Sequence, residues 1–376
     1  MRQLIIAILL AANSAFADEI VGFSAFGNGD YSTAYPHLMQ AANEGNDEAM
    51  YLLGRMYQYG FGVIQDEKKA SQWYEKAAQK NNALAQLSLG FLYDIGQGVP
   101  QNYQTAFNWY LKAAKLGNAI AERNVGLMYA AGEGVKKSDT EALNWFQKSA
   151  ALGYAKAQVN LAYQYLMGYG TPENVDKAMY WYEQAAKLGD ARAQYSLGLL
   201  YTGKYGIAPD QTAATYWLSQ AANQGHPSAQ TYLGYQYLNG LGVEASAQKA
   251  AYWYHAASEQ GNPQAQAEYG QLLLTGNGID KDYEQASYWL TKAAEQGDAF
   301  AQGRLGYLYL AGLGVEKDRV KAYAWFKLAA SNHNEAAREE LKRLESTLTP
   351  ENKADGDKFF QELQNKKPIK AGSDPG

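Results

Sequence analysis

The chain has 376 residues, of which 47% are hydrophobic and 19% are charged, and its formal net charge is −5. This length and composition allow a large buried core, and the slightly acidic balance gives the chain as a whole no affinity for nucleic acid. Cysteine is absent, which excludes disulfides, thiolate metal sites and a cysteine nucleophile.

The first 17 residues have the pattern of a secretory signal peptide. Arg2 is the single early charge, an apolar stretch runs from Leu4 to Ala12, and small residues at Ala15 and Ala17 form a cleavage signature. The apolar stretch is too short to span a bilayer, and the alternative of a buried N-terminal helix would place Arg2 in a core. We therefore expect residues 1–17 to be a signal peptide. The mature chain is then exported through the general secretory pathway and is either periplasmic or secreted.

A block of 36 residues recurs along most of the chain, and tryptophan marks it most clearly. Glycine and alanine keep the same step at several positions of the block, and a fixed period of this size indicates a repeat array. The eight tryptophans are Trp73, Trp109, Trp145, Trp181, Trp217, Trp253, Trp289 and Trp325.

Each block reads as two helices joined by a glycine turn. In residues 83–95 the apolar side chains recur at helical spacing, Gly96 and Gly98 then interrupt the pattern, and Asn102 opens a second apolar stripe that ends at Gly117. The residue that opens the second helix can accept a hydrogen bond from the first turn in all nine occurrences, which predicts a helical hairpin. These residues are Asp30, Asp66, Asn102, Ser138, Asn174, Asp210, Ser246, Asp282 and Asp318.

The block resembles the Sel1-like repeat family, a relative of the tetratricopeptide repeats. The resemblance rests on residues 85–99, which contain Ala-Gln-x-x-Leu-Gly-x-x-Tyr-x-x-Gly-x-Gly-Val, and on the Ala, Trp-Tyr, Ala-Ala and Gly pattern of residues 106–117. It implies an all-α fold, a right-handed α/α superhelix (solenoid) of eight helix-turn-helix repeats that serves as an adaptor for protein partners. The eight copies are residues 46–81, 82–117, 118–153, 154–189, 190–225, 226–261, 262–297 and 298–333, and in the fifth copy Gly203 and Gly206 stand one residue further apart than in the others.

The ends of an open stack need polar caps, and partial copies of the block are found at both ends. We expect residues 18–45 to form an N-terminal capping helix, because Asp30 to Gly45 matches only the second helix of the block. Residues 334–346 match only a first helix and are expected to form a C-terminal cap. A short helix is expected at 347–365, and the composition of 366–376 predicts a disordered tail.

Most of the recurring positions have a structural explanation. The tryptophans share a helical face with the alanines, so we expect them in the core or between repeats. Gly90 and its equivalents would cost roughly 1 kcal/mol each inside a helix relative to alanine. We therefore expect them to mark places where two helices cross too closely for a side chain.

The outward face of the first helices is unusually rich in apolar and aromatic residues. By analogy with the tetratricopeptide repeats, this face is expected to line a concave groove that binds a peptide or a helix, with aromatic and arginine anchors. The alternatives are a tightly wound interior that these side chains simply fill, and a second helix layer that covers them. Tyrosines at three of the positions favour the groove, since a hydroxyl requires water or a polar partner. The predicted groove residues are Tyr51, Arg55, Phe91, Arg123, Leu127, Tyr163, Tyr195, Tyr235, Gln271, Phe300 and Tyr307.

Nothing in the sequence predicts a catalytic, metal or cofactor site. The four histidines occupy four different positions of the block, and neither a nucleophile elbow nor a phosphate-binding loop occurs. Some cysteine-rich relatives in the Sel1-like family bind or hydrolyse β-lactams, but their disulfide-linked repeats have no counterpart here. We therefore expect no enzyme activity.

Lysines in the tail offer a different kind of contact. Lys366, Lys367 and Lys370 could meet anionic lipid head groups, each contributing up to about 1 kcal/mol, or they could be an ordinary solvated end of the chain. Lipid binding is therefore kept as an alternative.

The sequence as a whole predicts an exported, monomeric scaffold that binds proteins. The resemblance extends to exported, virulence-associated Sel1-like proteins of intracellular bacterial pathogens. These proteins engage host proteins, and they help the bacterium to contact host cells, to enter them or to traffic inside them. Other exported members remain in the periplasm and regulate envelope or cell-wall enzymes. The tyrosine-rich groove and the number of repeats favour the host-facing role.

Overall fold

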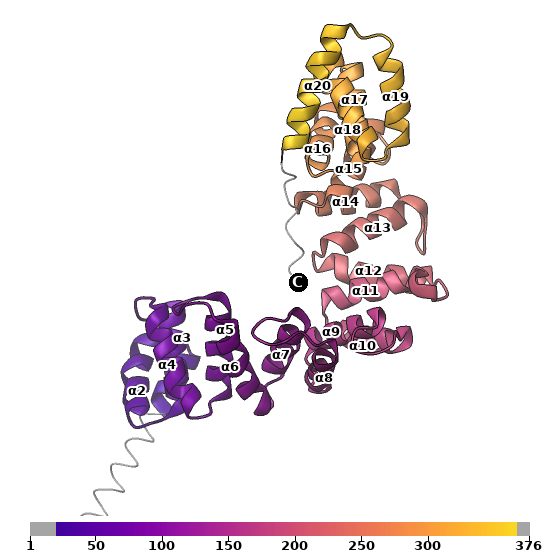
Figure 1. Cartoon of the computed structure of the whole chain (residues 1–376). Coiled ribbons are helices and arrows are strands. Elements are labelled where there is room, and N and C mark those ends of the chain that lie inside the picture. The colour runs from indigo at the N-terminus through magenta and orange to yellow at the C-terminus, as the bar shows by residue number, and fades with distance from the viewer. Residues whose placement is uncertain (1–19, 367–376) are drawn as a thin grey trace, which may run out of the picture. The chain divides into compact units, whose positions relative to one another are not determined.

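The computed structural model describes residues 20–366, and every regular element in that part of the chain is a helix (Figure 1). The predicted signal peptide at 1–17 lies outside the described residues. The predicted tail at 366–376, with Lys367 and Lys370, also lies outside the described residues, apart from Lys366. Among the described residues, no helix is both long and apolar enough to cross a membrane.

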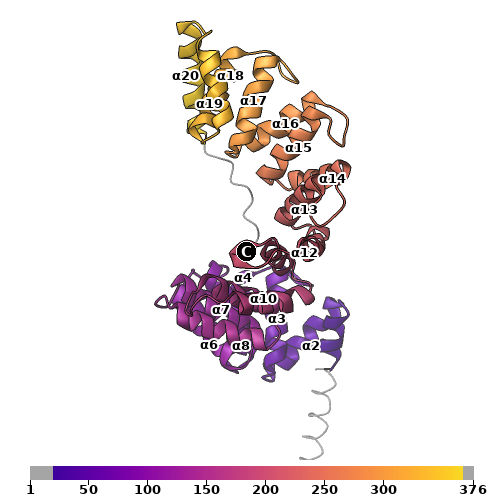
Figure 2. The ribbon, with the colours of Figure 1, turned by 90° about the vertical axis from the view of Figure 1, so that its right-hand side faces the viewer.

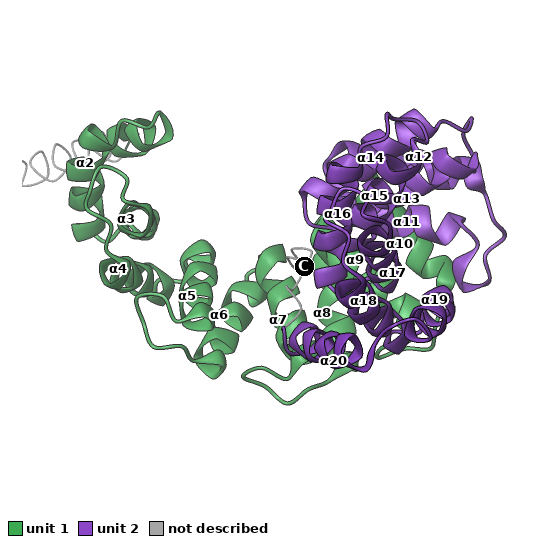
Figure 3. Ribbon diagram, turned by 90° about the horizontal axis from the view of Figure 1, so that it is seen from above, with its two compact units in different colours: residues 1–188 green, residues 189–376 purple. Residues whose placement is uncertain are grey.

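Contacts divide the chain into two compact units, residues 1–188 and residues 189–376, coloured green and purple in Figure 3. Within residues 20–366, the first unit holds the N-terminal helices and four hairpins, and the second holds four hairpins and the two C-terminal helices. The period of 36 continues across this boundary, which falls between the fourth and fifth hairpins.

Each predicted block forms a pair of antiparallel helices. Within a unit, every second helix packs against its own first helix and against the first helix of the following hairpin, as Figure 2 shows from α13 to α18. The pairs of the first unit are α3 (Asp47–Tyr59) with α4 (Glu67–Gln79), α5 (Ala83–Ile95) with α6 (Tyr103–Lys115), α7 (Ala119–Ala131) with α8 (Asp139–Ala151), and α9 (Ala155–Met167) with α10 (Val175–Lys187). Those of the second unit are α11 (Ala191–Tyr201) with α12 (Gln211–Asn223), α13 (Pro227–Asn239) with α14 (Ala247–Glu259), α15 (Pro263–Thr275) with α16 (Tyr283–Glu295), and α17 (Ala299–Ala311) with α18 (Arg319–Ser331).

The predicted caps of the second helices are confirmed in all nine cases. Each side chain accepts a hydrogen bond from the backbone N–H three residues further on, as Asn102 does from Thr105 at 2.9 Å. Seven of the eight first helices end at a glycine in the left-handed conformation, such as Gly96 with φ 73°. In the fifth hairpin, the longer turn instead forms a short 3₁₀ helix, η1 (Lys204–Gly206), with Tyr205 at φ 61°.

Small and apolar side chains fill the space between the helices. Alanines at the recurring positions, such as Ala106 and Ala113, have no exposed surface, and neither has Leu53 of the first hairpin. The tryptophans are packed less deeply than expected: Trp289 and Trp325 are buried, and the other six are half-buried. In the first three hairpins the Nζ of a lysine lies 3.8 to 4.0 Å from the centre of the tryptophan ring and covers its outer face.

The N-terminal end contains more structure than the single helix that was expected. Residues 20–27 are helical and precede α2 (Tyr31–Asn43). A methyl group at Gly22 would lie 3.2 Å from the backbone nitrogen of Leu38, so this glycine allows a close helix crossing like that of the repeats. The two helices therefore form an abbreviated hairpin at the start of the first unit.

Two helices follow the last repeat, and both pack on α18. The first is α19 (Glu335–Glu345), and the second is α20 (Pro350–Asn365). The hydroxyl of Tyr323 donates to Oδ1 of Asp357 at 3.0 Å, and the ammonium of Lys327 donates to the same carboxylate. Because α20 lies on α18, Trp325 is only 5% exposed.

Candidate protein-binding surface

The predicted groove residues lie on one face of the first helices, called here the first-helix face. Its main column is the position of Arg55 and its equivalents, which recurs every 36 residues. Four members of this column are aromatic and exposed: Phe91 (45%), Tyr163 (43%), Tyr235 (48%) and Tyr307 (46%). These side chains are not sealed beneath other helices of their own unit, so the alternative of a covering helix layer does not hold for them.

The neighbours of these aromatics on the same helix explain their exposure. In α9, Leu161, Ala162 and Tyr165 are buried against the adjacent helices, and Tyr163 stands between them on the opposite side. Its ring lies 6.0 Å from that of Tyr169 in the following turn. A helix with one buried stripe presents its other side to solvent, and here that side carries aromatic residues instead of charged ones.

Other predicted residues of the first unit are partly occupied by contacts within the protein. Tyr51 is half-buried, with its ring 5.8 Å from that of Tyr74, and burial raises the pKa of Tyr51. The guanidinium of Arg55 lies 5.5 Å from the ring centre of Phe26. Nε of Arg123 donates to Oδ1 of Asn160 at 2.8 Å and so joins α7 to α9.

Leu127 is half-buried on α7. On the same face of the first helices of the second and third hairpins, three apolar side chains are exposed: Leu84 (42%), Phe91 (45%) and Ile120 (42%). The first-helix face of the first unit is thus most apolar on α5 and α7, and Tyr163 follows on α9.

In the second unit, Tyr195 stacks on His226 with ring centres 4.6 Å apart, and it is half-buried. Gln271 is also half-buried, and its buried Oε1 has no hydrogen-bond partner among residues 20–366. Phe300 is 38% exposed, and the guanidinium of Arg304 lies 4.9 Å from its ring centre. Tyr235, Phe300 and Tyr307 are therefore the open members of the face in this unit.

A pocket of about 440 Å³ opens on this face at the end of the last repeat. Phe300, Tyr307 and Leu310 of α17 line one side, and Ala336 and Glu340 of α19 line the other. Predicted groove residues thus border a pocket in the second unit. That the face forms a continuous concave groove stays a prediction.

A second column of exposed tyrosines was not singled out from the sequence. Each tyrosine directly precedes a tryptophan of the second helix and meets it edge-on, with ring centres 4.9 to 5.1 Å apart. The helical phase next to the tryptophan and the step of 36 could have identified this column. Its members, called here the second-helix column, are Tyr180, Tyr216, Tyr252 and Tyr288, which are 54%, 55%, 65% and 50% exposed.

A larger pocket of about 660 Å³ lies between α16, α18 and α20, and Trp325, Leu328 and Leu363 line it. Lys366 borders this pocket, and its Nζ lies 3.8 Å from Oε1 of Glu295. This lysine is therefore partly engaged by a carboxylate of the protein.

Two of the four histidines make local contacts within the protein. Nδ1 of His226 accepts a hydrogen bond from the backbone N–H of Ala229 and caps α13, and Nε2 of His255 lies 3.6 Å from Oε1 of Glu259. Within residues 20–366, no three potential metal ligands among His, Asp and Glu stand together.

Comparison with known proteins agrees with the repeat pattern. The Sel1 repeat model matches eight consecutive segments, residues 47–82, 83–118, 119–154, 155–190, 191–226, 227–262, 263–298 and 299–334. No protein among curated sequences matches.

Two solved structures resemble most of the chain. One is the crystal structure of c5321, described as a protective antigen present in uropathogenic Escherichia coli strains and displaying an SLR fold. It is 30% identical over 96% of this chain and 86% of its own, with a TM-score of 0.58. The other is a Sel1 repeat protein from Oxalobacter formigenes, 33% identical over 82% of this chain and 89% of its own, with a TM-score of 0.62.

The predicted all-α solenoid of eight repeats is therefore confirmed. Solenoids built from such repeats are typically scaffolds without enzyme activity, and they typically bind other proteins. With eight matching segments that follow one another from residue 47 to residue 334, this chain belongs to the Sel1 repeat family.

Proposed function

We propose that this protein is an exported scaffold that binds partner proteins through the first-helix face. The observation that carries the proposal is the exposure of aromatic rings at one recurring position: Phe91, Tyr163, Tyr235 and Tyr307 are each 43–48% exposed. Large exposed apolar surfaces in soluble proteins commonly mark interaction sites.

The residue types on this face suit peptide recognition. Tyrosine and phenylalanine bring a large, rigid contact area, and tyrosine adds a hydroxyl that can pair with a partner's backbone. Each unit carries two of these rings, Phe91 and Tyr163 in the first and Tyr235 and Tyr307 in the second, and so offers several weak anchors to an extended segment or a helix. Individual anchors then need not bind tightly, since linking them increases the overall affinity.

The setting is proposed to be host-facing. The signal-peptide pattern of residues 1–17 supports export, and the likeness to a protein described as a protective antigen of uropathogenic strains supports contact with a host. The partners would then be host proteins that assist the bacterium in entering host cells or in trafficking inside them. The protein is proposed to act as a monomer.

A periplasmic regulator of envelope or cell-wall enzymes is the alternative setting for the same surface. Cell fractionation separates the two, because a host-facing factor must reach the medium or the cell surface, and a regulator must stay in the periplasm. Recovery of the mature chain only in the periplasm would contradict the host-facing setting and leave the binding surface in place.

Binding to anionic lipid is a second alternative, and one of its three lysines is already paired: Lys366 lies next to Glu295. Liposomes that contain anionic lipid, compared with neutral liposomes, test it with the full chain and with a variant lacking residues 367–376. Equal, weak sedimentation of both proteins with both liposomes would remove this alternative.

The binding surface itself is tested by capture of partners. The mature chain is used as bait in extracts of host cells and of bacterial envelopes, beside a variant with Tyr163, Tyr235 and Tyr307 changed to alanine. The variant is expected to keep its helical content and to lose the captured proteins. If neither extract yields a partner, or if the folded variant retains every partner, the proposed surface is wrong.

A further inference from the structure

We propose that the pocket between α17 and α19 is an anchor site for a partner segment in which an acidic side chain stands beside a large apolar side chain. The inference rests on the proposed function, because it assigns the partner chemistry to one place on the first-helix face. The pocket belongs wholly to the second unit.

The pocket lies at a place where one repeat lacks a side chain at a recurring position. Gly303 stands where the other first helices carry larger residues, such as Tyr51, Val159 and Tyr195. A methyl group at Gly303 would already lie 3.0 Å from Nδ2 of Asn334, the residue that caps α19. The missing side chain therefore lets the cap of α19 approach α17 closely, and Asn334 donates to the backbone carbonyl of Ala299 at 2.8 Å; Gly303 itself lines the pocket beside this contact.

Apolar side chains form most of its walls. Phe300 and Tyr307 are exposed at its mouth, Leu310 is half-buried, and Phe326 of α18 lies at its base with 2% exposure. A volume of about 440 Å³ lies in the range of small binding pockets and can accommodate a large side chain with part of its neighbour. It is too small for a whole helix, so we assign to it an anchor side chain rather than a complete partner element.

Arg304 brings a positive charge to the pocket, and its guanidinium forms no ion pair within residues 20–366. Its guanidinium lies 4.9 Å from the ring centre of Phe300, and its buried Nε has no hydrogen-bond partner among residues 20–366. The charge of Arg304 acts on Glu268: burial raises the pKa of that carboxyl, and Arg304 opposes the shift. An arginine in such a place favours a carboxylate, which can accept parallel hydrogen bonds from the guanidinium.

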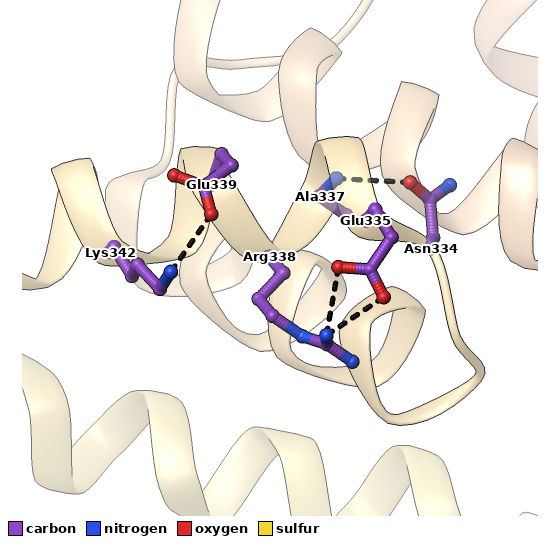
Figure 4. A network of polar contacts seen from close by, with 6 residues as sticks. All are labelled: Asn334, Glu335, Ala337, Arg338, Glu339 and Lys342. Atoms are coloured by element: carbon purple, nitrogen blue, oxygen red, sulfur yellow. Dashed lines mark hydrogen bonds and ion pairs between the residues drawn. The ribbon is translucent and has the colours of Figure 1, made fainter.

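The acidic residues that line the pocket are already paired. Nζ of Lys342 donates to Oε1 of Glu339 at 2.8 Å, as Figure 4 shows, and Nη1 of Arg343 lies 2.9 Å from Oε1 of Glu340. The unmatched charge at the pocket is therefore that of Arg304. A single carboxylate matches the one positive charge of Arg304, whereas a phosphate group carries up to about two negative charges near neutral pH.

The test is selection from a random peptide display library on the full chain. Two variants change the pocket in different ways. Arg304→Gln removes its positive charge, and Ala336→Phe, at an exposed position on α19, fills its volume with a larger side chain. Arg338→Gln is the matched control, since this arginine pairs with Glu335 beside the pocket without lining it (Figure 4).

Peptides retained by the wild-type chain are expected to carry Asp or Glu next to a large apolar residue. The best of these should bind Arg304→Gln and Ala336→Phe at least about tenfold more weakly, and it should bind Arg338→Gln as it binds the wild type. Changing its acidic residue to the amide should weaken binding to the wild type and have little further effect on Arg304→Gln.

Other outcomes overturn the inference in distinguishable ways. If selected peptides depend on Tyr163 and Tyr235 but are indifferent to Arg304→Gln and Ala336→Phe, the pocket assignment fails and the proposed surface remains. If the selected peptides lack acidic residues, the proposal that the pocket binds a carboxylate is wrong. If no peptide is retained by the wild-type chain, the pocket and the surface fail together.

Discussion

A methyl group at Gly90 would stand 2.6 Å from Cδ1 of Tyr110, so these two residues set how closely α5 and α6 cross. The same relationship joins Gly54 to Tyr74, where the distance would be 2.5 Å. The expectation that this glycine column marks close helix crossings is therefore confirmed, and it explains why a residue with a poor helix propensity recurs inside the first helices.

We predict that Gly90→Ala destabilises the protein. The methyl group must displace the buried ring of Tyr110, which costs about 1–3 kcal/mol and outweighs a gain of roughly 1 kcal/mol in helix propensity. Gly27→Ala is the control, because nothing lies within 4 Å of its added methyl group and its φ is not positive. Urea unfolding should show a lower midpoint for Gly90→Ala only, and equal midpoints for the two variants would refute the crossing argument.

Among the turn glycines, those that touch the preceding hairpin should be more sensitive to substitution than those that face open space. Gly314 has φ +66°, and a methyl group there would lie 1.9 Å from the backbone oxygen of Tyr283 in the preceding hairpin. Gly225 has φ +88° with nothing within 4 Å, so alanine there meets only the left-handed strain of about 1–2 kcal/mol.

Gly314→Ala is therefore expected to lower the free energy of unfolding by at least about 1–3 kcal/mol more than Gly225→Ala does. Thermal unfolding of the two variants in parallel measures the difference. A loss at Gly225 as large as that at Gly314 would mean that backbone strain alone, and not contact between hairpins, requires these glycines.

Glu122 stands where six other first helices carry glutamine. Such a glutamine donates to a backbone carbonyl of the preceding helix, as Gln86 does to Ala78 at 3.0 Å. Glu122 is 7% exposed, and its Oε2 has no hydrogen-bond partner within residues 20–366. We expect Glu122→Gln to donate to Ala114 and to stabilise the protein by about 1 kcal/mol near neutral pH.

The same residue predicts a pH dependence. Burial raises the pKa of Glu122 above its ordinary value of 4.5, and Lys148 opposes the shift only in part. Because the folded state favours the protonated form, this residue lowers stability progressively as the pH rises above 4.5. The advantage of Glu122→Gln in urea midpoint should therefore grow from acidic to neutral pH. A constant advantage, or one shared by the exposed control Glu133→Gln, would contradict this reasoning.

The sequence was sufficient for the repeats because their determinants are local. Nine polar residues such as Asn102 cap the second helices, and glycines such as Gly96 end the first ones, each within its own turn. The abbreviated hairpin at the N-terminus was missed, although Gly22 plays the role of Gly54, because a shorter connection breaks the period of 36.

The surface was predicted less completely, since helical phase gives the direction of a side chain and not the size of its neighbours. Phe91 and Tyr307 are open as expected, but Tyr195 is partly covered by His226. The tryptophans show the same limit. Trp325 is buried because α20 packs over α18, and nothing in the sequence of residues 350–365 specifies that position.

The central claim is that the exposed aromatics of the first-helix face hold the partner. Its most direct measurement compares the affinity of a captured partner for two triple variants: Tyr163, Tyr235 and Tyr307 to alanine, and Tyr180, Tyr216 and Tyr252 to alanine. Both sets are tyrosines of similar exposure, but the second set lies on the second-helix column. We predict a loss of at least about thirtyfold for the first variant and less than about threefold for the second. Equal losses, or a greater loss for the second-helix column, would contradict the account.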